Sequence, residues 1–268
     1  MRIISLRMYA DPPIVDAAND ALWAAIAMRL AARGIDAPPE LDRSGDFDAA
    51  WLAPDLLLAQ TCGYPLVTRL GAEVQVVAAP IYGFPGGDGF YRASLIVVRS
   101  DEPAGEIAAL RGRRVAANAP DSNSGTNLLR ALVAPLNRAG RFFGAVTWTG
   151  SHAASLAAVR AGHADVAAVD SVTFGLFAAH APERIAGLRV LAETPYGPGL
   201  PLITAAATPP RELGALRDAL AEVAADRELA GVRATLGLTG MAFPDFADYE
   251  VLADHARAAA AAGYPELA

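Results

Sequence analysis

Apolar and polar positions along this chain form two alternating kinds of segment. Short, nearly continuous apolar runs, such as 55–60 (DLLLAQ) and 166–170 (VAAVD), predict buried strands. In longer segments apolar residues recur every three or four positions, as at 14–28, which predicts helices. Because the two kinds alternate, the sequence predicts parallel α/β layers. The predicted strands are 2–8, 55–60, 74–79, 93–99, 113–118, 145–149, 166–170, 188–193 and 202–206. The predicted helices are 12–33, 64–70, 124–139, 151–161, 171–180, 210–226, 228–236 and 246–262.

Two segments dense in glycine and proline divide this pattern. They are 82–89 (YGFPGGDG) and 195–201 (PYGPGLP), and they bracket a complete α/β block of about one hundred residues. Two such crossings predict a hinge and a ligand cleft. We therefore expect a first lobe made of residues 1–90 and 196–268, the latter including the return strand and the C-terminal helices, and a second lobe of residues 91–195.

Composition narrows the possible functions. The chain is 53% hydrophobic and carries a net charge of -7, which disfavours nucleic acid as a partner. All 22 basic residues are arginine, so a lysine-bound pyridoxal phosphate is excluded, and we expect no cofactor. The single cysteine, Cys62, excludes an intramolecular disulfide. No apolar run reaches the roughly 18 residues of a membrane span.

Polar residues gather where a predicted strand meets the long helix that begins near residue 124. Hydroxyl and amide groups at a helix start suit a tetrahedral oxyanion, because the free N–H groups and the helix dipole favour negative charge there. An ordinary helix cap needs only one such residue. The candidate ligand-binding residues of this loop are Ser122, Asn123, Ser124, Gly125 and Thr126.

Two further loops follow strands of the same block. Ser151 can cap a helix, which places His152 in the first turn, where the dipole disfavours a cation. His152 is therefore either a neutral donor to an anion or a solvent-facing side chain. Asp170 ends an apolar strand, so it is either an N-cap or a carboxylate that pairs with a ligand cation.

Other candidates lie close to the first strand, to the short helix at 64–70 and to the first crossing. Thr61 and Tyr64 flank Cys62, and Tyr9 and Tyr91 either line a cleft or pack the hinge. Cys62 has no base near it in sequence, which favours a buried wall residue over a nucleophile. The four histidines form no helical ligand pair, so no metal site is predicted.

Several of these segments together resemble the phosphonate-binding family, the periplasmic receptors of phosphate, phosphite and phosphonate ABC transporters. The matching segments are 91–94 (YRAS), 110–116 (LRGRRVA), 122–125 (SNSG), 150–152 (GSH) and 162–171 (GHADVAAVDS). The resemblance implies the two-lobed type II periplasmic binding protein fold and a non-catalytic receptor for a small anionic ligand, served by an ABC permease. It also implies that Ser122, Ser124 and His152 contact phosphoryl oxygens and that Asp170 holds the amino group of an aminoalkylphosphonate.

The start of the sequence keeps an alternative open. The first residues, MRIISLRM, read as a strand and not as an export signal, so the chain as written is expected in the cytoplasm, whereas the family is periplasmic. A cytoplasmic enzyme of the same fold, similar to menaquinone-pathway enzymes acting on carboxylated compounds, could use Asp170 or His152 as an acid or base.

Overall fold

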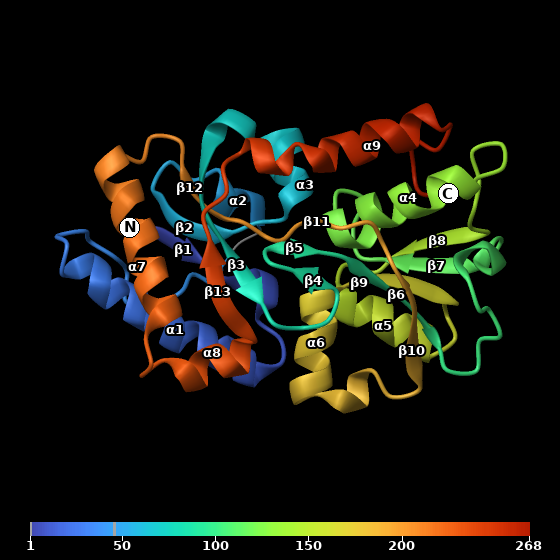
Figure 1. The fold of residues 1–268 in the computed structure, drawn as a ribbon, viewed down its shortest axis with the longest axis horizontal. Coiled ribbons are helices and arrows are strands. Elements are labelled where there is room, and N and C mark those ends of the chain that lie inside the picture. The colour runs from blue at the N-terminus through green and yellow to red at the C-terminus, as the bar shows by residue number, and fades with distance from the viewer. Residues whose placement is uncertain (1, 45–46) are drawn as a thin grey trace. The chain divides into compact units, whose positions relative to one another are not determined.

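The computed structural model describes residues 2–44 and 47–268, and they form two compact units. Unit 1 comprises Met1–Gly83 and Pro198–Tyr249, and unit 2 comprises Phe84–Gly197 and Glu250–Ala268 (Figure 1). Each unit has its own β-sheet covered by helices, so the predicted α/β class is confirmed. The described residues include no helix long and apolar enough to cross a membrane.

The sheet of unit 1 has the strand order β1-β2-β12-β3-β13. β1 and β2 are parallel, whereas β12 and β13 run antiparallel to their neighbours. Helices α1, α7 and α8 pack together, with α7 and α8 against β13 and α7 also against β3, and α2 packs on β1, β2 and β12 (Figure 1). The strands are β1 (Ile3–Ser5), β2 (Leu56–Gln60), β3 (Val74–Tyr82), β12 (Leu202–Ala205) and β13 (Leu238–Ala242). The helices are α1 (Pro13–Ala31), α2 (Phe47–Trp51), α3 (Gly63–Pro65), α7 (Pro210–Ala225) and α8 (Ala230–Leu236).

The main sheet of unit 2 has the order β10-β6-β9-β7-β8. β7 lies parallel to both β8 and β9, and β6 runs antiparallel to β9 and β10. The strands are β6 (Ser94–Arg99), β7 (Arg114–Ala117), β8 (Ala145–Trp148), β9 (Val166–Asp170) and β10 (Leu188–Glu193), beside a small sheet of β4 (Gly87–Asp88), β5 (Tyr91–Arg92) and β11 (Gly197–Pro198). The helices are α4 (Leu128–Val133), α5 (His152–Arg160), α6 (Ser171–His180) and α9 (Val251–Ala261).

Alternating side chains of the unit 2 strands belong to two different cores, because successive residues of a strand point to opposite faces. On β6, Ile96 and Val98 pack with residues of α4 and α9, whereas Leu95 and Val97 pack with residues of α5 and α6. Figure 1 shows these two helix layers on either side of the sheet. The central strands β6, β7 and β9 are therefore buried on both faces, which explains the continuous apolar runs in their sequence.

The C-terminal segment corrects the expected domain division. Residues 196–268 were grouped with the first lobe, but the chain enters unit 2 a second time at Glu250. Ala259, Tyr264 and Leu267 are buried in the core formed with α4. Backbone N–H groups of Phe142 and Phe143 also donate to the carbonyl of Ala268, at 2.8 and 2.9 Å. An amphipathic Ala-rich helix fits either unit on sequence alone, and these contacts decide which unit it joins.

Three element predictions also need correction. The strand expected at 2–8 ends at Ser5, where a 3-10 turn at Arg7–Tyr9 follows, and β1 is an edge strand that pairs with β2. The helix expected at 124–139 is a π-helical turn (Asn123–Asn127), then α4, then a 3-10 turn containing Pro135, which lacks the N–H needed to continue an α-helix. The strand β13 lies between the helices predicted at 228–236 and 246–262, where no strand was predicted, and it pairs with β3.

Candidate functional site

Three polar loops of unit 2 meet at one edge of its sheet. They follow β7, β8 and β9, which are parallel neighbours. Parallel strands present their carboxyl ends at the same edge, where ligands of open α/β sheets bind. The sheet topology thus brings together Ser122–Thr126, Ser151–His152 and Asp170, which are far apart in sequence.

The loop after β7 is held by bonds of different kinds. The hydroxyl of Ser122 caps the turn by accepting from the N–H of Gly125 at 3.0 Å. Thr126 donates its hydroxyl to the carbonyl of Ala119 at 2.6 Å, so this side chain also fastens the loop. The carbonyl of Ser124 accepts from the hydroxyl of Ser94, at the start of β6, at 2.7 Å. All of the residues from Ser122 to Asn127 are buried. The conformation of this loop is therefore held by several hydrogen bonds.

Gly125 is required by a close approach. A Cβ atom built on it would lie 1.7 Å from Oδ1 of Asn118, the residue that follows β7. That Oδ1 atom is buried and makes no hydrogen bond among the described residues. No other residue type fits at position 125 without moving Asn118.

Ser124 and His152 join two of the three loops. Oγ of Ser124 lies 2.9 Å from Nε2 of His152. Ser151 caps α5 by accepting from the N–H of Ala154 at 3.1 Å, and this cap places His152 at the first helical position. Of the two serines in the first loop, Ser122 is thus committed to a backbone cap, whereas the hydroxyl of Ser124 meets a side chain.

Burial disfavours the charged form of the His152 ring. Burial lowers the pKa of His152, and the charge of Asp170 and the carbonyl of Ala168 oppose that shift. The N-terminal end of α5 also disfavours a cation at this position. Nδ1 is buried and makes no hydrogen bond of normal geometry among the described residues. An anion placed beside the ring would favour the protonated form, because it adds its negative charge to that of Asp170.

Asp170 caps α6 and contributes charge to the site. Its Oδ1 atom accepts from the N–H groups of Val172 and Thr173, at 2.9 and 3.0 Å, and the residue is 4% exposed. Oδ1 therefore has the N-cap role, which was one of the two interpretations of Asp170. Within the described parts of the chain, Oδ2 has no hydrogen-bond partner among protein atoms.

The remaining candidates lie elsewhere. Tyr91 is in β5 of unit 2, partly exposed, with its ring tilted against that of Phe90. The other three belong to unit 1. Tyr9 is buried edge-on against Tyr82, Thr61 is fully buried and directs its hydroxyl toward the Cys62 carbonyl, and the Tyr64 carbonyl accepts from Thr68.

Sequence reasoning missed two residues that shape this site. Ser94 binds the backbone of the ligand loop, and Asn127 is a fully buried amide at the end of that loop. The signal for Ser94 was a polar residue at the start of an otherwise apolar strand. The contact that sets the position of Asn127 carried no local signal, because the Leu252 carbonyl lies 125 residues away in sequence.

A protein-family model matches residues 43–249 of the chain, which is most of its length. Its description is "ABC transporter, phosphonate, periplasmic substrate-binding protein". The chain belongs to this phosphonate-binding family. The family consists of solute-binding proteins that act with ABC transporters, as predicted, and it gives no support to the enzymatic alternative. No curated protein sequence matches the chain significantly.

Solved structures share the fold at low sequence identity. A binding component of a phosphonate ABC transporter from Pseudomonas aeruginosa has a TM-score of 0.77 and 16% identity, covering 98% of this chain and 87% of its own. PhnD1 from Prochlorococcus marinus, in complex with methylphosphonate, has a TM-score of 0.73 and 14% identity over 96% and 97% of the two chains. A Xanthomonas citri protein bound to chloride ion has a TM-score of 0.72 and 17% identity over 97% and 98%. These similarities confirm the predicted two-lobed fold class.

The site of this phosphonate-binding family member contains Ser, His and Asp but lacks the geometry of a nucleophilic triad. In such a triad the acid accepts a hydrogen bond from Nδ1 of the histidine and fixes its tautomer. Here Nδ1 of His152 has no such partner, and Asp170 uses Oδ1 to cap α6. Residues 2–44 and 47–268 also contain no group of three or more His, Cys, Asp and Glu side chains placed to hold a metal ion.

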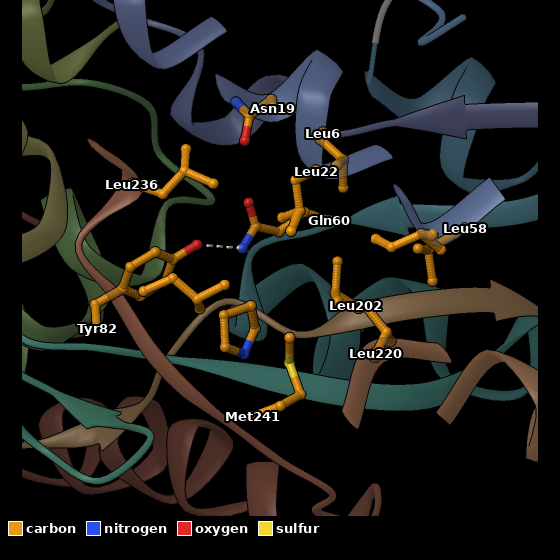
Figure 2. Close-up of a pocket in the computed structure, with 13 residues that line it drawn as sticks. Leu6, Asn19, Leu22, Leu58, Gln60, Tyr82, Leu202, Leu220, Leu236 and Met241 are labelled. Atoms are coloured by element: carbon orange, nitrogen blue, oxygen red, sulfur yellow. Dashed lines mark hydrogen bonds between the residues drawn. The ribbon is translucent and has the colours of Figure 1, made fainter. Parts of the chain in front are cut away.

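A separate pocket lies within unit 1 (Figure 2). Its lining is mainly leucine, with polar groups from Asn19, Gln60 and Tyr82. Figure 2 shows the Gln60 amide directed at the Tyr82 hydroxyl, and the two atoms are 3.4 Å apart. Its volume of about 30 Å³ has room for about two water molecules.

Proposed function

We propose that this protein binds a small tetrahedral oxyanion of the phosphonate, phosphate or phosphite type and delivers it to an ABC permease. The single observation that carries the proposal is the contact of Ser124 with His152 at the carboxyl edge of three parallel strands. Membership of the phosphonate-binding family supports the same ligand class. Since the family is periplasmic, we propose that the protein acts there, and fractionation of cells that produce it tests this location.

Within the site, we propose that Ser124 and His152 are direct donors to the ligand. A neutral His152 that carries its proton on Nδ1 accepts the Ser124 hydroxyl proton at Nε2, so Ser124 cannot then donate to an anion. If Nε2 carries the proton, it donates to Oγ of Ser124 and frees the serine hydroxyl for the ligand. In the neutral Nε2 tautomer Ser124 alone donates to the anion, and only the imidazolium leaves a second N–H group, on Nδ1, with which His152 can donate as well. Ser122, Asn123, Gly125, Thr126 and Ser151 contribute by holding the two loops that present these donors.

We propose that Asp170 distinguishes among phosphonates. Because its capping bonds use Oδ1, Oδ2 can pair with an ammonium group on an aminoalkylphosphonate. A fully ionised ligand without a cation would instead meet the like charge of this carboxylate. Asp170 thus favours zwitterionic ligands over simple dianions.

Calorimetric titration with phosphate, methylphosphonate and aminoethylphosphonate tests the proposal. Asp170→Asn keeps an oxygen that accepts from Val172 and Thr173 and removes the charge. It should weaken aminoethylphosphonate and leave methylphosphonate unchanged or tighter. The proposed ligand class is wrong if the parent protein binds none of the three compounds.

A further inference from the structure

The ligand loop ends at a buried amide that connects it to the C-terminal part of unit 2. Asn127 is 0% exposed. Its Nδ2 group donates to Oδ1 of Asn123 at 3.1 Å and to the carbonyl of Leu252 at 2.9 Å. Its Oδ1 atom accepts from Arg130 at 3.0 Å. Every hydrogen-bonding group of this side chain is therefore used, and one bond reaches a residue 125 positions away in sequence.

Leu252, whose carbonyl accepts from Asn127, lies close to the point where the chain enters unit 2 for the last time. It lies at the start of α9, directly after the chain enters unit 2 for the last time at Glu250. Gly197, the last residue before the chain leaves unit 2, packs on the side chain of Leu252. A Cβ atom at position 197 would lie 2.6 Å from Cδ2 of Leu252 and 3.9 Å from Nδ2 of Asn123. Two of the three crossings thus meet beside the ligand loop.

We propose that Asn127 is a positioning residue for the oxyanion loop, which it holds against the two crossings at Gly197 and Leu252. The loop is then fixed from two directions, by Ser94 from the sheet and by Asn127 from α9. The position of Ser124 relative to His152 depends on the second of these contacts. The part of this inference that concerns ligand affinity rests on the proposed function, whereas the part that concerns the loop does not.

The chain offers a matched control for this contact. Asn137, just beyond α4, donates through Nδ2 to the carbonyl of Ala262 at 2.9 Å. This bond also joins the α4 region to the C-terminal segment, but at the end opposite to the ligand loop. Alanine at position 127 or at position 137 should loosen α4 from α9, whereas only Asn127→Ala should displace the ligand loop.

The first measurement is hydrogen exchange in the ligand-free protein, followed in peptides that cover residues 122–127. We expect Asn127→Ala to raise exchange there about tenfold, because the amide bond that restrains the loop is lost. Asn137→Ala should raise exchange only around its own turn. Should Asn127→Ala fail to fold, Asn127→Ser carries the test, since its hydroxyl is too short to reach Leu252. Unchanged exchange at 122–127, or an equal increase in the Asn137 variant, overturns the proposal.

The second measurement is the affinity for methylphosphonate by calorimetry, well below the unfolding temperature. Asn127→Ala should raise Kd about tenfold, and Asn137→Ala should leave it unchanged. Parent protein that binds no oxyanion refutes the proposed function, and the exchange measurement then still decides the positioning role. Parent protein that binds, with an Asn127 variant that binds equally well, refutes the positioning role alone.

Discussion

The hydroxyl of Ser124 and Nε2 of His152 lie 2.9 Å apart, although 28 residues separate them in sequence. One residue sits in a turn after β7 and the other opens α5 after β8. The parallel pairing of these two strands brings the loops together. Because the Ser124 hydroxyl serves no backbone cap, it is the group in this loop that a ligand can recruit at the lowest cost in folding stability.

The two loop serines should therefore respond differently to substitution. Ser124→Ala should weaken oxyanion binding about ten- to a hundredfold, equivalent to about 1.5–3 kcal/mol, with little change in unfolding temperature. Ser122→Ala removes the cap on Gly125 and should cost about 1 kcal/mol of folding stability. Calorimetry and thermal unfolding on both variants check this division. A Ser124 variant that binds as tightly as the parent would remove Ser124 from the site.

Ligand binding should be linked to proton uptake at His152. Burial lowers the pKa of His152 in the free protein, and a bound anion raises it. Binding near neutral pH should therefore take up a fraction of a proton, and affinity for a ligand of fixed charge should rise as the pH falls. Titrations in buffers with different heats of ionisation measure the uptake. His152→Gln should abolish it, whereas His163→Gln, at an exposed position, should not.

The same shift in His152 has a consequence for the stability of the ligand-free protein. Its pKa in the folded state lies below the unfolded value of about 6.5, so the unfolded chain binds more protons between the two values. This contribution to stability is present above the unfolded pKa and is lost as the pH falls toward the folded value. Denaturant unfolding of His152→Gln between about pH 7 and 5 should show a weaker pH dependence than that of the parent. An identical pH dependence of the free energy of unfolding in the variant and the parent would contradict this expectation.

Gly125 should not tolerate alanine. The new methyl group would meet Oδ1 of Asn118 at 1.7 Å and its Cγ at 2.9 Å, so the loop must move. We expect Gly125→Ala to destabilise the protein by about 1–3 kcal/mol and to impair binding. Gly214→Ala is the control, because a Cβ atom there meets nothing within 4 Å and α7 should gain up to about 1 kcal/mol. Equal unfolding temperatures of the two variants would contradict this expectation.

The C-terminal segment should be part of the folding core of unit 2. Leu267 is 8% exposed and lies in one cluster with Phe142. Leu267→Ala should cost about 2–5 kcal/mol in the free energy of unfolding. Leu52→Ala, at a side chain that is 48% exposed, should cost far less. Denaturant unfolding distinguishes them, and similar losses would mean that residue 267 is not packed in this core.

The sequence by itself determined the strands of the main sheet of unit 2 and the residue types of the site. The strands at 93–99 and 166–170 were predictable because a sheet covered on both faces requires continuous apolar runs. The loops with Ser122, His152 and Asp170 were predictable because polar residues between a strand and a helix suit caps and anion sites alike. Local pattern could not separate those two roles, since both use the same side chains at the same positions.

The tertiary structure alone decided which contacts these residues make. The pairing of Ser124 with His152 follows from strand order, which periodicity does not encode. The segment formed by α9 and the residues after it joins unit 2 because Ala259 and Leu267 pack into a core of that unit. By its sequence alone, an amphipathic helix could cover either unit. Asn127 acquires its role only because the Leu252 carbonyl lies within reach. Hydrogen bonds and packing between distant segments depend on three-dimensional proximity, and a linear pattern carries only the propensity to form each segment.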